Sequence, residues 1–144
     1  MKRNISQKLL AAVFLTLLMP ALVFARDIPP VVSTDWLSAN LKNPKLIVLD
    51  VRSVEDYREG HIPGAVNAFY RAWAYMKDGL FSSLPDKDDI DDTIGYFGIH
   101  FDNWVVVTGC MDTPRLSYQS ARVACTLQYA GIANVALLDG GMNK

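Results

Sequence analysis

The chain has 144 residues, of which 51% are hydrophobic and 20% are charged, the proportions of a single globular domain. Without Lys2, Arg3 and Lys8, the remaining 11 basic residues face 15 acidic ones, a formal charge of −4. This balance argues against nucleic acid or an acidic membrane surface as a partner.

The N-terminal segment has the pattern of a secretory signal. Three basic residues precede an uncharged run over residues 9–25, which Pro20 interrupts and which ends Val23-Phe24-Ala25. A basic start, an apolar middle and a small residue at the end predict a signal peptide over residues 1–25, cleaved after Ala25. The alternative is an uncleaved anchor, but 17 residues with a proline are short against the ~20 of a spanning helix. We therefore expect a periplasmic or secreted domain over residues 26–144.

The first half of this domain alternates strands with helices. Residues 46–51 (LIVLDV) form a continuous aliphatic run, which is typical of a strand buried on both faces of a parallel sheet. Ser33 or Thr34 can cap the first helix, Ser53 can cap the second, and Gly60 follows the second helix. Strands are expected over residues 31–32, 46–51 and 65–70, and helices over residues 35–41 and 54–58.

The second half continues the alternation after an irregular stretch over residues 71–85, in which Trp73, Tyr75 and Phe81 are expected to be partly buried. Residues 86–99 place apolar side chains on one helical face, with acids near the helix start, where the helix dipole favours them. The run WVVV (104–107) predicts a strand, and VALL (135–138) predicts the last one. Between them an amphipathic pattern runs from Leu116 to Ala130 and ends at Gly131.

Alternating strands and helices predict an α/β fold: a mostly parallel, five-stranded sheet with helices on both faces. In such folds ligands bind beyond the carboxyl ends of the strands. Asp50, Arg52 and Cys110 all lie at those ends. The segment from Trp104 to Arg115, in which a strand delivers a thiol to the mouth of a helix, is the centre of the predicted site.

Two stretches resemble the signatures of the rhodanese (sulfurtransferase) family. They are LIVLDVRSVEDYREGHIPGAVN (46–67) and, after WVVVTG, the run ARVACTLQYAGIANVALLDGG (121–141). The resemblance implies a rhodanese-like fold and transfer of a sulfane sulfur from a donor such as thiosulfate to a cyanide or thiol acceptor. The carrier would be a persulfide on Cys110, whose pKa the positive end of the following helix would lower.

The resemblance also assigns roles around Cys110. Four residues separate it from Arg115, the loop length that sulfurtransferases use, so Arg115 is expected to bind the donor. Asp50, Arg52 and Gly109 are expected to support the site. No cofactor is expected, and no metal-ligand cluster or phosphate-binding glycine motif is present in the sequence. A phosphatase of the related fold would have one more residue between cysteine and arginine.

A second interpretation stays open. Gly109 occupies the position directly after the strand, where active family members have cysteine, and Pro114 removes one N–H from the loop. The sequence resembles the N-terminal domain of tandem rhodaneses, which serves as a structural or docking partner of a second rhodanese domain. The family continues beyond Gly141 into a further helix, so the chain is expected to lack its final helix.

The second cysteine, Cys125, is expected to be a buried packing residue. If the helix starts at Pro114, Cys125 lies eleven residues along it, ~16 Å from the start. A disulfide needs Cα atoms within ~7 Å, which argues against a bond to Cys110. His61, in the GHIPGA turn, is expected to stabilise that turn.

Overall fold

The computed structural model describes residues 26–143. The predicted signal peptide lies outside the described residues. Five strands form one parallel sheet in the order β1-β7-β6-β2-β3. Their bounds are Val31–Val32 for β1, Leu46–Asp50 for β2, Val66–Asn67 for β3, Trp104–Thr108 for β6 and Val135–Leu138 for β7.

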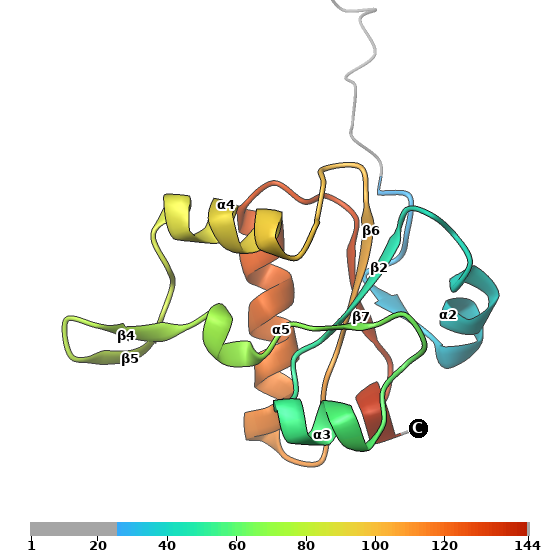
Figure 1. Cartoon of the computed structure of the whole chain (residues 1–144), viewed down its shortest axis with the longest axis horizontal. Helices are drawn as coiled ribbons and strands as arrows, with labels where there is room; N and C mark the ends of the chain where they lie inside the picture. Colours follow the sequence, from blue (N-terminus) through green and yellow to red (C-terminus); the bar gives the residue numbers. More distant parts are fainter. Residues whose placement is uncertain (1–25, 144) are drawn as a thin grey trace, which may run out of the picture.

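Helices cover both faces of this sheet, which confirms the predicted fold class. Helices α4 (Lys87–Tyr96) and α5 (Pro114–Tyr129) lie on one side, and α2 (Thr34–Asn40) lies on the other (Figure 1). Helix α3 (Val54–Glu59) crosses the carboxyl edge of the sheet, at the bottom of that view. None of the helices in residues 26–143 has the length and hydropathy that a membrane crossing requires.

The central strands β2 and β6 are buried on both faces because alternate side chains enter two separate cores. Val105 and Val107 pack with Leu127 of α5 in the larger core. Val106 packs with Leu37 of α2 in the smaller one. The register pairs Asp50 with Thr108, so both strands end at the same level and deliver the chain to the same edge.

Local capping fixes where three of the helices begin. The side chains of Ser33, Ser53 and Thr113 accept hydrogen bonds from backbone N–H groups three residues ahead, as N-caps do. Pro114 takes the first helical position of α5, where its missing N–H costs nothing. The loop from the end of β6 to α5 therefore comprises residues 109–113.

One element was not predicted. Residues expected to be irregular form an antiparallel hairpin of β4 (Tyr75–Lys77) and β5 (Leu80–Ser83), which projects from the body (Figure 1). Asp78 and Gly79 both have positive φ, as a two-residue hairpin turn requires. Trp73 is buried as predicted, at 1% exposure, and donates its indole N–H to the Ala68 carbonyl. The predicted burial of Phe81 is wrong, because it lies on the projecting hairpin at 83% exposure.

Candidate functional site

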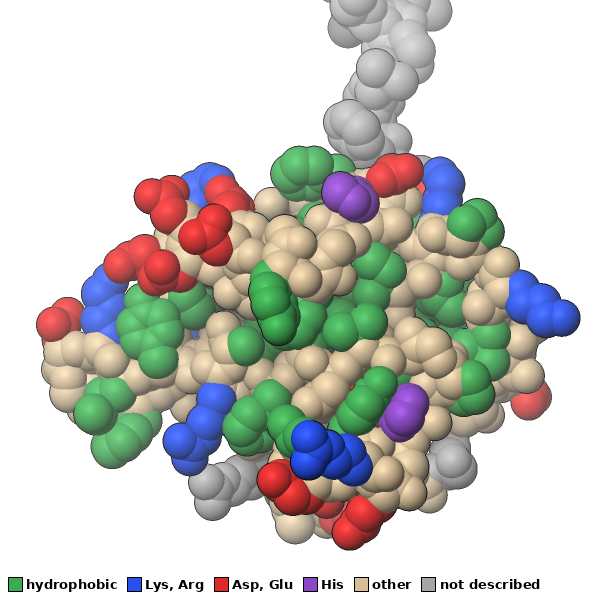
Figure 2. All heavy atoms as spheres, in the orientation of Figure 1, with side chains coloured by type: hydrophobic (Ala, Val, Ile, Leu, Met, Phe, Trp, Pro, Cys, Tyr) green, Lys and Arg blue, Asp and Glu red, His purple; other side chains and the backbone are tan. Residues whose placement is uncertain are grey.

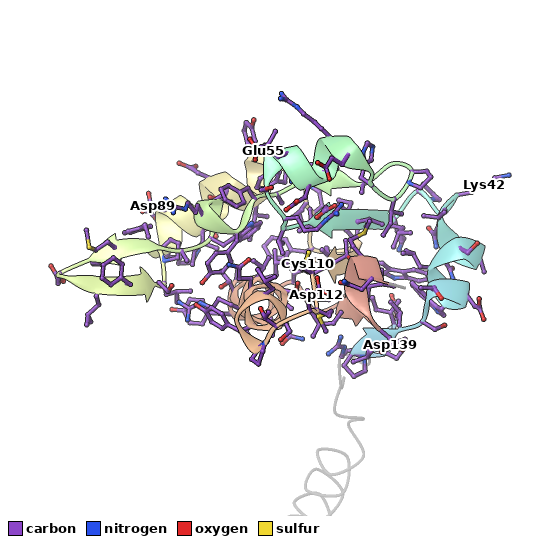
Figure 3. All side chains as sticks on the ribbon, turned by 90° about the horizontal axis from the view of Figure 1, so that it is seen from below. Lys42, Glu55, Asp89, Cys110, Asp112 and Asp139 are labelled. Carbon is purple, nitrogen blue, oxygen red and sulfur yellow. The ribbon has the colours of Figure 1, made fainter. Side chains whose placement is uncertain are left out.

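The candidate site is a pocket of about 190 Å³ at the carboxyl edge of the sheet. Cys110 lines it together with Arg52, with Asp56 of α3 and with Gln119 of α5. Figure 3 shows Cys110 between α3, α5 and the last turn of the chain. The structure thus brings the thiol, Asp50 and Arg52 to one edge, as the ends of parallel strands predict.

A buried ion pair forms one wall of this site. The Asp50 carboxylate is fully buried and accepts hydrogen bonds from two nitrogens of the Arg52 side chain, from Nε at 3.0 and 3.1 Å and from Nη2 at 2.6 Å. The same Nη2 also donates to the Gly60 carbonyl, which ties the end of α3 to the end of β2. These hydrogen bonds to Asp50 raise the pKa of the Arg52 guanidinium, which stays cationic beside Cys110.

Gly109 leaves no room for a side chain directly after β6. A Cβ atom there would lie 2.5 Å from Ser120 Oγ and 3.0 Å from Val51 Cγ2. With this packing, a cysteine at position 109 would displace Ser120 of α5. The thiol of this loop is carried one residue later, by Cys110.

The last turn of the chain holds the thiol loop. This 3₁₀ turn, η2 (Gly141–Asn143), donates the Met142 N–H to the Gly109 carbonyl at 3.0 Å. The Asn143 amide oxygen accepts the Met111 N–H at 3.0 Å, and its nitrogen donates to the Asp112 carboxylate. The loop is consequently fixed from outside as well as by the N-cap of α5.

Backbone donors remain available in the loop. Within the part of the chain that the structure describes, the N–H groups of Cys110, Asp112 and Thr113 have no hydrogen-bond acceptor, whereas that of Met111 is used by Asn143. Free N–H groups before a helix suit an anion. The pocket offers an anionic ligand the Cys110 thiol and the Arg52 guanidinium, and the loop that carries the thiol has unpaired N–H groups.

The pKa of the Cys110 thiol is raised, which contradicts the expectation that the following helix would lower it. Partial burial is the largest cause. Arg52 acts in the opposite direction, but the negative charges of Asp56, Asp112 and Asp50 add to the rise. At neutral pH a larger fraction of Cys110 is therefore protonated than for an ordinary cysteine. The thiolate becomes abundant only at higher pH.

This balance of charges is open to test. Asp56→Asn in a Cys125→Ser background should lower the pKa of Cys110 and speed its alkylation by iodoacetamide about twofold at pH 7, since one nearby negative charge is lost. The measurement is the alkylation rate from pH 6 to 10. Glu55→Gln removes the neighbouring acid of α3 and serves as the control. An unchanged profile for Asp56→Asn would show that Asp56 does not contribute to the raised pKa of Cys110.

The sequence singled out three further residues, Arg115, Cys125 and His61, whose positions in the structure follow. Arg115 belongs to the first turn of α5, but its side chain lies outside the described part of the structure. Cys125 is exposed, not buried, because the buried stripe of α5 runs through Ser120, Val123 and Leu127. Both cysteines are free thiols.

His61 Nδ1 lies 2.9 Å from the Tyr57 carbonyl and its ring stacks on Tyr57, in keeping with a role in the turn.

Sequence reasoning missed three residues that shape the site. Ser120 closes position 109, Asp56 sets part of the thiol electrostatics, and Asn143 holds the loop. The position of Asp56 in the first turn of a helix that follows β2 could have predicted that it lies near the site. Nothing in the sequence pattern could have predicted the contact of Asn143 with the loop. In residues 26–143, no group of three or more His, Cys, Asp or Glu side chains is arranged to hold a metal ion.

Fold and site together define the class of this protein: a parallel α/β domain that presents a thiol in the loop between its central strand and the next helix. The model of the Rhodanese-like domain family matches residues 33–144, and the chain belongs to this family.

Its relatives include larger sulfurtransferases. The chain is 31% identical to a putative thiosulfate sulfurtransferase of Synechococcus elongatus over 125 residues, 86% of this chain and 38% of the relative. It is 32% identical to thiosulfate/3-mercaptopyruvate sulfurtransferase 2 of Arabidopsis thaliana, covering 80% of this chain and 35% of that one. The chain therefore spans well under half the length of these relatives.

Solved structures share the fold. YnjE superposes with a TM-score of 0.66 at 24% identity, covering 78% of this chain and 28% of that one. The Escherichia coli 3-mercaptopyruvate sulfotransferase SseA gives a TM-score of 0.61 at 23% identity, covering 79% and 42%.

Proposed function

We propose that this domain transfers sulfane sulfur from a small anionic donor, such as thiosulfate, to a thiol or cyanide through a persulfide on Cys110. The observation that carries the proposal is the position of this thiol, in a pocket beside the Arg52 cation and in a loop with free backbone donors. Membership of the rhodanese family and relatives named as thiosulfate sulfurtransferases support it.

The proposed reaction has two balanced steps. The Cys110 thiolate attacks the outer sulfur of thiosulfate, a new S–S bond forms, the donor's S–S bond breaks, and sulfite leaves with the electron pair. The acceptor then attacks the outer sulfur of the persulfide and releases the Cys110 thiolate. Arg52, the loop N–H groups and, by our proposal, Arg115 hold the donor's negative charge, while Asp50 and Gly109 fix the ends of the two strands.

The test is to weigh the protein after incubation with thiosulfate at pH 8 to 9. The pKa of Cys110 is raised, so more of the thiolate forms at this pH than at neutral pH. We expect an adduct of about 32 Da, one sulfur atom, in the wild type and in Cys125→Ser, and none in Cys110→Ala. Cyanide should remove the adduct and yield thiocyanate. If no adduct forms while iodoacetamide still alkylates Cys110, the sulfurtransfer proposal fails.

That failure would favour a second function, a non-catalytic rhodanese module that serves as the structural or docking half of a larger sulfurtransferase. The raised pKa of Cys110 and the use of the Met111 N–H by Asn143 favour this alternative. The length of the relatives is consistent with it, because each has room for a second domain.

We further propose that the domain works after export to the periplasm or outside the cell. The support is the sequence pattern of residues 1–25 alone. Expression of the full chain in a bacterium that secretes proteins should yield a polypeptide that begins at Arg26, as N-terminal sequencing would reveal. Recovery of the uncleaved chain in the cytosol would contradict the proposal.

A further inference from the structure

Cys110 shares its pocket with one described cation, Arg52, whose donors are mostly occupied. The Arg52 guanidinium donates to the Asp50 carboxylate from Nε and Nη2, and to the Gly60 carbonyl from Nη2. Among the described residues, only its Nη1 is left without an acceptor. Because Asp50 balances the charge of Arg52, the ion pair brings little net positive charge to a ligand in the pocket.

A second charge at the pocket, the carboxylate of Asp56, is not balanced. Asp56 lines the pocket and belongs to no ion pair within residues 26–143. Its Oδ2 accepts the Ser53 hydroxyl at 2.8 Å, which fixes the direction of the carboxylate. Burial is the largest cause of the raised pKa of Cys110, and Asp56 is the acid that adds most to it. The charge of Asp56 therefore reaches the thiol.

The charges around this wall of the pocket are mostly negative as well. Helix α3 contains three acidic residues and one arginine. Figure 2 shows acidic side chains together at the lower edge of the molecule, where α3 lies in Figure 1. On the other side of the thiol, Figure 3 shows Asp112 beside Cys110. Among the described side chains, the excess charge near Cys110 is consequently negative.

Two uncharged residues of the pocket wall also suit a cation. Phe69 lines the pocket with a side chain that is 38% exposed, and the face of an aromatic ring attracts an ammonium group. The amide of Gln119 lines the pocket without a hydrogen-bond partner among the described side chains. Its oxygen can accept a hydrogen bond from an ammonium group. Asp56, Phe69 and Gln119 thus supply a carboxylate, a ring and an amide oxygen to one cavity.

We infer that the pocket selects a small thiol that carries an ammonium group, and that this thiol is the acceptor of the sulfur. Its role as acceptor rests on the proposed function, in which it enters after the anionic donor has left. The acceptor thiolate attacks the outer sulfur of the Cys110 persulfide and forms a new S–S bond. The S–S bond to Cys110 breaks, and the Cys110 thiolate leaves with the electron pair. The ammonium group stays protonated and pairs with Asp56.

The experiment compares three thiols that differ in charge: cysteamine (cationic), 2-mercaptoethanol (neutral) and 3-mercaptopropionate (anionic). Cys125→Ser protein is loaded with thiosulfate and freed of excess donor, and each thiol's removal of the sulfur adduct is followed by mass. The rate for Asp56→Asn is divided by the rate for the parent, so that the different acidities of the thiols cancel. Relative to the neutral thiol, this ratio should be about 3-fold lower for cysteamine and about 3-fold higher for 3-mercaptopropionate. Added salt should reduce both differences.

Two further variants sharpen the result. Glu55→Gln removes an acid of α3 that does not line the pocket, and it should leave the order of the three thiols unchanged. Phe69→Leu should slow cysteamine about 2-fold relative to the neutral thiol. Equal ratios for the three thiols in Asp56→Asn would overturn the inference, because Asp56 would then act on Cys110 and not on the acceptor.

A parallel measurement separates this charge preference from sulfur transfer. The Cys110 thiolate attacks the disulfide of each thiol, a mixed disulfide forms, and the other half leaves as a thiolate. The cationic disulfide, cystamine, should depend on Asp56 as cysteamine does. If thiosulfate yields no adduct but cystamine keeps this dependence, sulfur transfer and the acceptor role fail, whereas the preference for a cationic thiol stands. If the adduct forms and neither measurement depends on charge, the preference fails and sulfur transfer stands.

Discussion

Asp50→Asn is expected to lower the free energy of unfolding by about 3–5 kcal/mol, the cost of removing one partner of a buried ion pair. The carboxylate is fully buried, and the Arg52 side chain is only 11% exposed. The asparagine side chain fills the same space but is neutral. It offers the Arg52 guanidinium one acceptor oxygen, whereas the carboxylate offers two. The guanidinium would keep its charge in a site with little access to water. Urea denaturation followed by circular dichroism measures the loss.

The exposed pair between Lys87 and Asp91 provides the matched control. Both side chains are largely in solvent, so Asp91→Asn should leave the unfolding midpoint nearly unchanged. The double variant Asp50→Asn/Arg52→Gln should recover part of the stability, because it removes the unpaired charge. If Asp50→Asn unfolds at the wild-type midpoint, the ion pair does not hold the ends of β2 and α3 together.

Gly141→Ala is expected to cost about 2–4 kcal/mol, through a steric clash added to backbone strain. Gly141 has φ +58°, and a Cβ atom there would lie 2.2 Å from the Gly109 carbonyl oxygen and 2.8 Å from Met111 Cγ. The backbone oxygen cannot move aside without displacing the loop that carries Cys110. Thermal and urea unfolding should both register the loss.

Gly64→Ala separates the two contributions. Gly64 also has a positive φ, +79°, but no atom lies within 4 Å of its added Cβ. It should therefore show only the strain of a left-handed residue, about 1 kcal/mol. An equal decrease in the free energy of unfolding for Gly141→Ala and Gly64→Ala would mean that η2 moves aside at little cost and does not hold the loop in place.

The regular elements were predictable where local chemistry fixes them. The aliphatic run of β2 and the residues VALL of β7 are typical of buried strands, and both strands begin where the sequence predicts. Ser33, Ser53 and Thr113 mark helix starts because each hydroxyl satisfies a free backbone N–H. The hairpin was missed although Asp78-Gly79 is a strong turn signal, because its strands lack alternation between buried and exposed residues.

The candidate site was predictable in position and less so in chemistry. The parallel pairing of β2 with β6 sets Asp50 opposite Thr108 and so brings Asp50 and Cys110 to one edge, as the predicted parallel sheet requires. The clamp by Asn143 joins residues 32 apart in the chain and depends on the path taken after β7. The predicted direction of the Cys110 pKa shift was wrong because the burial of the thiol, together with the acids Asp56 and Asp112, outweighs Arg52.

The contact of η2 with the thiol loop makes residues 26 and 143 unequal as attachment points. Arg26 donates to the carbonyl of Val135, at the start of β7, on the edge opposite Cys110. Asn143 touches Met111 and Asp112 directly. A load or a dye joined after residue 143 is thus mechanically connected to the residues beside the thiol, whereas one joined before residue 26 is separated from them by the sheet. A probe attached at residue 143 is therefore better placed than one at residue 26 to sense what binds at Cys110.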